Sequence, residues 1–75
     1  MYNDKIAEYL VESATVRVET ALSELFGVRK GLSESGRYSP TLMEAYEKLW
    51  GSYEALCRAS GREVKSERRV VFLEA

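Results

Sequence analysis

Histidine is absent from this sequence of 75 residues, and cysteine occurs once, at Cys57. Without histidine, the Ser-His and Cys-His catalytic pairs and the usual zinc and di-iron ligand sets are excluded. A single cysteine also excludes an internal disulfide framework and is typical of a reducing compartment, so we expect a cytoplasmic protein. The sequence therefore predicts that the protein is not an enzyme and needs neither a metal nor another cofactor.

Long hydrophobic runs are also missing. No stretch approaches the roughly 18 apolar residues of a membrane span, and the first residues lack the basic and then apolar pattern of a secretory signal. The net charge of -1 gives no overall attraction to nucleic acid or to an anionic membrane. A folded chain of this size buries only about 60% of the surface that its unfolded chain exposes, so we expect oligomerisation or a partner.

Proline occurs once, and it marks the clearest boundary in the chain. Ser39 is a favourable N-cap and Pro40 a favourable first helical residue, while Tyr38 and Met43 occupy the positions of a hydrophobic staple. The pattern predicts a helix over residues 40–60 that ends before Gly61.

An earlier helix is expected over residues 3–26, with Asn3 as its N-cap and Gly27 as its left-handed terminal residue. Residues 27–39 contain three glycines and show neither helical nor strand periodicity, so this segment is predicted to be a loop.

Apolar side chains recur at helical spacing in both predicted helices. The first helix has a seam of alternating small and larger residues, and the second has a stripe that includes two tyrosines. Their complementary volumes predict an antiparallel helical hairpin over residues 1–61. The seam consists of Ala7, Val11, Ala14, Val18, Ala21 and Leu25, and the stripe of Leu42, Tyr46, Leu49, Tyr53 and Leu56.

Residues 62–75 differ in character from the rest. Val70 to Leu73 form a continuous run of β-branched, aromatic and aliphatic residues, which favours a short strand or an extended arm. Such a strand would have to pair with Arg62–Lys65, with a second copy or with another protein. A third short helix that starts at Ser66 is the alternative. The predicted fold class is mainly all-α, a helical hairpin with a C-terminal arm that dimerises into a helical bundle.

Two surfaces are candidates for binding a partner. One is a line of apolar residues away from the seam of the first helix, and the other is a ridge of small residues opposite the stripe of the second. The alternatives are scattered exposed apolar residues and a simple bend at the glycine. The candidate partner-binding residues are Tyr2, Ile6, Tyr9 and Val16 on the line, and Gly51, Ala55 and Ala59 on the ridge.

Basic residues cluster in the predicted loop and in the tail. They are candidates for nucleic-acid binding if an antiparallel dimer brings loop and tail together. The basic tail could instead lie along the acidic side of the first helix, which carries Asp4, Glu8, Glu12 and Glu19. The candidate nucleic-acid-binding residues are Arg29, Lys30, Arg37, Arg62, Lys65, Arg68 and Arg69.

The favoured function is a small non-enzymatic protein–protein interaction protein that acts through helical faces. It would be an adaptor, an inhibitor or an assembly factor of the kind found in phages and mobile elements, and its expected partners are a second copy of itself and another protein. The alternatives are a nucleic-acid-binding regulator and a sensor that binds a small ligand at a dimer interface near Tyr46 and Trp50.

Overall fold

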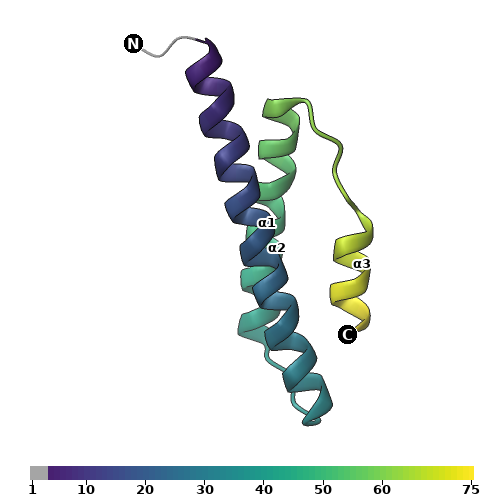
Figure 1. The fold of residues 1–75 in the computed structure, drawn as a ribbon. Helices are drawn as coiled ribbons and strands as arrows, with labels where there is room; N and C mark the ends of the chain where they lie inside the picture. The colour runs from purple at the N-terminus through teal and green to yellow at the C-terminus, as the bar shows by residue number, and fades with distance from the viewer. Residues whose placement is uncertain (1–3) are drawn as a thin grey trace.

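The computed structural model describes residues 4–75, and these residues form three helices and no strand. The helices are α1 (Asp4–Glu34), α2 (Pro40–Ser60) and α3 (Glu67–Glu74), shown in Figure 1. The predicted all-α class is therefore confirmed, whereas the predicted strand or extended arm at residues 70–73 is wrong. The proposed N-cap Asn3 lies outside the described residues.

Helix α1 ends later than predicted. It continues through Gly27 and Gly31 with helical backbone, so the predicted end at Phe26 and the predicted loop over residues 27–39 are wrong. The helix ends at Gly36, whose φ of 69° is left-handed. There the N–H of Gly36 donates to the carbonyl of Ser33, and the N–H of Arg37 to that of Leu32, as in a Schellman motif.

Helix α2 has the predicted bounds because its signals are local. The Ser39 hydroxyl accepts a hydrogen bond from the N–H of Leu42 at 3.1 Å, which caps the amino-terminal end. At the other end, Gly61 has a φ of 71°, and the N–H of Arg62 donates to the carbonyl of Cys57 at 2.9 Å. The prediction for residues 40–60 is confirmed at both ends.

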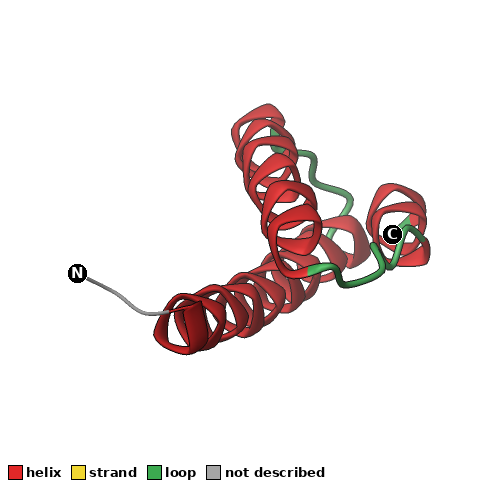
Figure 2. Ribbon diagram, turned by 90° about the horizontal axis from the view of Figure 1, so that it is seen from above, coloured by secondary structure: helices red, strands yellow, loops and turns green. Residues whose placement is uncertain are grey.

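Helices α1 and α2 run in opposite directions and cross at an angle (Figures 1 and 2). Four of the six buried apolar residues belong to α2, so its centre supplies most of the core. Leu42 and Leu49, two members of the predicted stripe, are only partly buried. The burial is shifted toward Trp50 because α3 packs beside α2. The buried core consists of Leu22, Tyr46, Trp50, Tyr53, Cys57 and Phe72.

Helix α3 is held by one buried ring and by the end of α1. Phe72 is 0% exposed and stacks on Tyr46 with ring centroids 3.5 Å apart. The Arg29 guanidinium donates to the carbonyls of Phe72 and Leu73, and the Ser33 hydroxyl donates to that of Ala75. These carbonyls belong to the last turn of a helix, where intrahelical donors run out; the N–H of Ala75 also donates to the carbonyl of Phe72, at 3.3 Å.

These contacts explain why residues 70–73 are helical. A strand would present alternate side chains to one face, whereas the helix buries Phe72 and leaves Val70, Val71 and Leu73 partly exposed. The expected strand partner, Arg62–Lys65, lies in the connection instead, where the N–H of Lys65 donates to the Tyr53 hydroxyl at 3.1 Å. The alternative of a short third helix is the one that the structure shows.

The chain is extended for its size. Its radius of gyration is 14.3 Å, compared with about 11 Å for a compact domain of this length. Its accessible surface is 5404 Å², compared with roughly 4,650 Å² for a monomeric protein of this mass. The fold therefore leaves much surface uncovered.

The Phe72→Ala variant should undock α3. Loss of the buried ring should lower the free energy of unfolding by about 3 kcal/mol. Amide hydrogen exchange should show faster exchange over residues 67–75 while the centres of α1 and α2 stay protected. Val70→Ala, at an exposed position of the same helix, is the control. Unchanged protection of α3 in Phe72→Ala would contradict the role given to the ring.

Candidate protein-interaction surface

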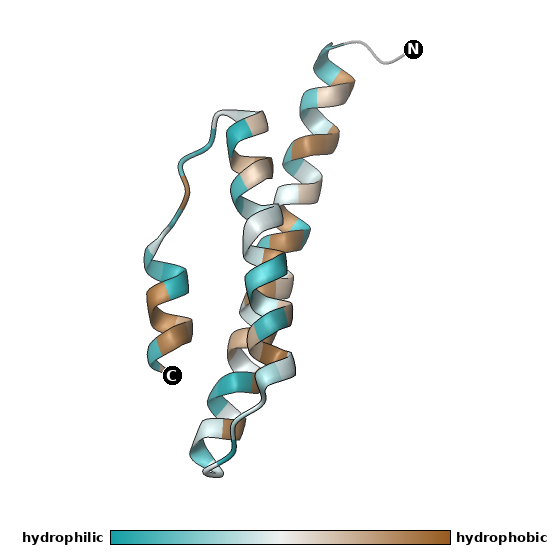
Figure 3. Cartoon of the chain, turned by 180° about the vertical axis from the view of Figure 1, so that it is seen from behind, coloured by the Kyte–Doolittle hydropathy of each residue, from teal (hydrophilic) through white to brown (hydrophobic). Residues whose placement is uncertain are grey.

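The side of α1 that faces away from the core carries exposed apolar residues, and we call it the outer face. Tyr9 is 68% exposed and Val16 is 54% exposed, and Ile6 is also exposed on this side. At 100° per residue, Tyr9 lies roughly 140° around the helix from the buried Leu22. Figure 3 shows that hydrophobic segments continue along α1 toward its amino-terminal end. The predicted partner-binding residue Tyr2 lies outside the described residues.

A shallow hollow of about 360 Å³ lies on this face. Tyr9 and Val16 form its apolar walls, and the short side chain of Ser13 lies between them. Glu12 and Arg17 complete the lining. The hollow is open and partly apolar, so it could accept a side chain from another protein.

The residues of the small-residue ridge predicted on α2 have different surroundings in the structure. Gly51 and Ala55 are exposed, and a Cβ atom added at Gly51 would meet nothing within 4 Å. Ala59 is exposed as well, and it lines a hollow between the start of α1 and the end of α2, together with Ala7 and Val11. The ridge therefore makes no close contact at Gly51 within the chain.

Two of the arginines predicted to bind nucleic acid form ion pairs with the same carboxylate. Glu19 on α1 lies 3.4 Å from Arg62 and 3.3 Å from Arg68, and its own side chain is only 14% exposed. A third, Arg69, makes two short contacts, of 2.7 and 2.9 Å, with the carboxylate of Glu47 on α2. The basic tail thus lies against acidic groups of its own chain.

Arg29 is also occupied, because it binds the carbonyls at the end of α3 and lies 5.3 Å from the centroid of the Phe72 ring. Among residues 4–75, no ion pair holds Lys30, Arg37 or Lys65. Lys30 belongs to the last turns of α1, Arg37 to the turn that follows, and Lys65 to the connection before α3. Of the seven basic residues predicted to bind nucleic acid, four therefore form contacts within the fold and three are exposed.

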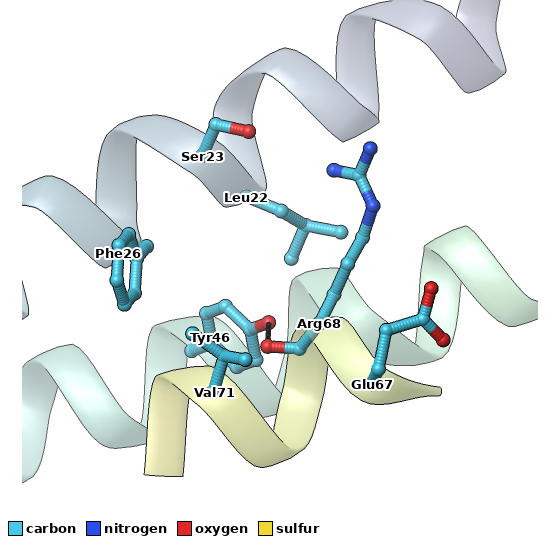
Figure 4. Close-up of a pocket in the computed structure, with 7 residues that line it drawn as sticks. All are labelled: Leu22, Ser23, Phe26, Tyr46, Glu67, Arg68 and Val71. Carbon is cyan, nitrogen blue, oxygen red and sulfur yellow. Dashed lines mark hydrogen bonds between the residues drawn. The ribbon is translucent and has the colours of Figure 1, made fainter. Parts of the chain in front are cut away.

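A small cavity lies between α1 and α3, above the ring of Tyr46 (Figure 4). Its volume is about 190 Å³, below the roughly 300 Å³ at which pockets for small ligands begin. Its walls are mainly apolar, and Trp50 is not among its lining residues. The lining consists of Leu22, Ser23, Phe26, Tyr46, Glu67, Arg68 and Val71.

Two buried tyrosines form hydrogen bonds with the backbone at and before the start of α3. The Tyr46 hydroxyl donates to the carbonyl of Arg68, and the Tyr53 hydroxyl accepts from the N–H of Lys65. Burial raises the pKa of Tyr46 above its usual value, against the lowering effect of the nearby Arg68 and Arg69. Burial also raises the pKa of Tyr53, although the hydrogen bond from the N–H of Lys65 acts in the opposite direction. Both groups keep their protons at neutral pH and act as hydrogen-bonding parts of the core.

No family model, curated protein or solved structure matches this chain. Within residues 4–75, no group of three or more histidine, cysteine, aspartate or glutamate side chains could hold a metal ion. No helix within that range combines the length and the apolar content that are needed to cross a membrane. The function must therefore be argued from the surface of the molecule.

The roles of two residues that hold α3 differ from those predicted from the sequence. Arg29 is a predicted nucleic-acid contact, yet its guanidinium binds the carbonyls at the end of α3. Phe72 lies in a segment predicted to be a strand, yet it is helical and buried in the core. Ser66 followed by the acidic Glu67 was the available signal for α3, because this pair is typical of a helix start.

Stability should fall as pH rises above about 10. The pKa values of Tyr46 and Tyr53 are higher in the folded state than in the unfolded state, where they are near 10. The contribution of these protonated groups to the free energy of unfolding is therefore complete below about pH 10. It is lost as the pH rises from there through the higher pKa values of the folded state. Urea unfolding between pH 8 and 11.5 measures this. Tyr53→Phe should flatten the decline, at a cost of about 1 kcal/mol at neutral pH.

Tyr38→Phe is the matched control, because the Tyr38 ring is exposed. It should leave the pH profile unchanged. The same decline in Tyr53→Phe and in the wild type would contradict the assignment for Tyr53.

Proposed function

We propose that this chain is a non-enzymatic protein–protein interaction module, an adaptor, inhibitor or assembly factor, that acts through the outer face of α1. The observation that carries this proposal is the exposure of Tyr9 and Val16 on the side of α1 that faces away from the core. Tyrosine is enriched at protein interfaces because its ring buries a large area at a low entropic cost. The hollow beside Ser13 gives this surface a shape that a partner can fill.

The energetics of the fold support a partner as well. Among residues 4–75, six apolar residues are buried in the core, and the chain is more extended than a compact domain of its length. Burial of exposed apolar surface contributes roughly 25 cal/mol for each Å². An interface along α1 would therefore add stabilisation that the single chain leaves unused.

Both alternative functions have less support. The nucleic-acid alternative needs a patch of free cations, but Arg29, Arg62, Arg68 and Arg69 bind oxygens of their own chain. The ligand-sensor alternative needs a pocket at a dimer interface, but the cavity near Tyr46 is small and lies within one chain. A cytoplasmic location is part of the proposal, since Cys57 is a buried free thiol.

A photo-crosslinking amino acid at position 9 tests the proposal in living cells. Tyr9 is exposed, so its replacement should leave the fold intact, and we expect irradiation to give discrete crosslinked protein bands. The same amino acid at Lys48, on the solvent side of α2 and 78% exposed, is the control and should give none. No crosslink from position 9, or equal crosslinks from both positions, would contradict a specific surface on α1.

A further inference from the structure

Two glycines on the outer face have no role within the single chain. Gly27 and Gly31 lie inside α1 with helical backbone, and both are exposed. A Cβ atom added at either position would meet nothing within 4 Å. Neither glycine is needed for a turn or for close packing inside the chain, so contacts within the chain do not explain their small size.

The outer face is arranged symmetrically about Thr20. From Tyr9 to Gly31 its positions are separated by four, three, four, four, three and four residues, an order that is the same in both directions. The two apolar residues lie before Thr20 and the two glycines after it. The positions are Tyr9, Ser13, Val16, Thr20, Glu24, Gly27 and Gly31.

We propose that the partner on this face is a second copy of the chain, with the two α1 helices antiparallel and a two-fold axis at Thr20. This proposal rests on the proposed function and names its partner. In this register Tyr9 lies over the partner's Gly31, and Ser13 lies over the partner's Gly27. Val16 lies over the partner's Glu24. Each glycine thus makes room for a larger residue, and the same residues contact each other twice, as a two-fold interface requires.

Charges along the edges of the face favour the same register. Along one edge Lys5 would meet the partner's Glu34, and Glu12 would meet the partner's Lys30. Along the other edge Arg17 would meet the partner's Glu24. None of these six residues forms an ion pair within the described chain. In a parallel arrangement each edge would face the opposite edge of the partner, so these same-edge pairs would not form.

The uncovered area is also of the right size. The chain exposes 5404 Å², about 750 Å² more than a monomer of its mass. A standard interface buries about 800 Å² on each partner. The positions from 9 to 31 extend over about 33 Å of helix, which is long enough for a contact of that area.

The small-residue ridge of α2 fits a second copy less well. Gly51 and Ala55 have no large exposed apolar residue beside them, and Glu44 and Lys48 are already paired with each other at 3.1 Å. The outer face of α1 offers apolar area and unpaired charges, which the ridge lacks.

Light scattering after size exclusion tests the proposal on the full chain. The wild type should have twice the mass of the 8.5 kDa chain. Gly27→Leu and Gly31→Leu should each halve that mass and keep a helical circular dichroism spectrum, because leucine favours helix and its Cβ would meet no atom within 4 Å in the single chain. Thr41→Leu, at an exposed position on α2, should remain a dimer.

Three outcomes would overturn the proposal. The first is a wild type that is monomeric at all concentrations tested, and the second is a dimer that survives both glycine substitutions. The third is a dimer that is lost in Gly51→Leu alone, which would move the contact to α2. A monomeric wild type that still crosslinks to a foreign protein from position 9 would leave the proposed function standing while this inference fails.

The register has its own test with engineered cysteines. Thr20→Cys should form an intermolecular disulfide on oxidation, since the two copies meet at the axis. Ser13→Cys should not, because the register places its two copies about 21 Å apart along the helix. Cys57 is buried and stays out of this reaction. Crosslinking at position 13 as efficient as at position 20 would overturn the antiparallel register.

Charge reversal tests the ion pairs separately. Arg17→Glu should lower the dimer fraction at a fixed concentration, because it places two carboxylates together. The double variant with Arg17→Glu and Glu24→Arg should restore it. A double variant that dimerises no better than Arg17→Glu would overturn this pairing.

Discussion

The stacking of Phe72 on Tyr46 is the contact on which the rest of the molecule depends. Helices α1 and α2 alone would leave the ring of Tyr46 uncovered on the side where it stacks on Phe72. Phe72, from the eight-residue helix α3, covers this ring. An isolated helix of this length is unstable in water, so α3 exists because its ring is buried and its terminal carbonyls are bound.

The way α3 is held determines which charges remain for function. Its arginines and those of the preceding connection face Glu19 and Glu47, and Arg29 closes its last turn. Exposed ion pairs contribute little to stability, but here they orient a short helix whose apolar face is narrow. Four of the seven basic residues predicted to bind nucleic acid, Arg29, Arg62, Arg68 and Arg69, join α3 or the connection before it to α1 or α2, and the outer face of α1 remains exposed.

Local signals in the sequence were sufficient for some elements and not for others. Helix α2 could be bounded because Ser39, Pro40 and Gly61 act on the neighbouring backbone. The end of α1 could not be placed, since Gly27, Gly31 and Gly36 are equally able to end a helix. The choice depends on contacts from Arg29 and Ser33 to residues more than 40 positions away. The exposure of Tyr9 and Val16 could be predicted from helical periodicity. Gly27 and Gly31 could not be placed on the same face, because the sequence predicted a loop over residues 27–39.

Docking of α3 and the proposed dimer contact are therefore linked through α1. Arg29 and Ser33 bind α3 from one side of the last turns of α1, and Gly27 and Gly31 lie on the other side of the same turns. Two glycines within five residues cost about 2 kcal/mol relative to alanine, so this end of α1 would fray without tertiary support. The contacts to α3 supply that support. Only when these turns are helical does the outer face extend to Gly31 and become symmetric about Thr20, so the buried contact at Phe72 is a condition for the surface on the opposite side of α1.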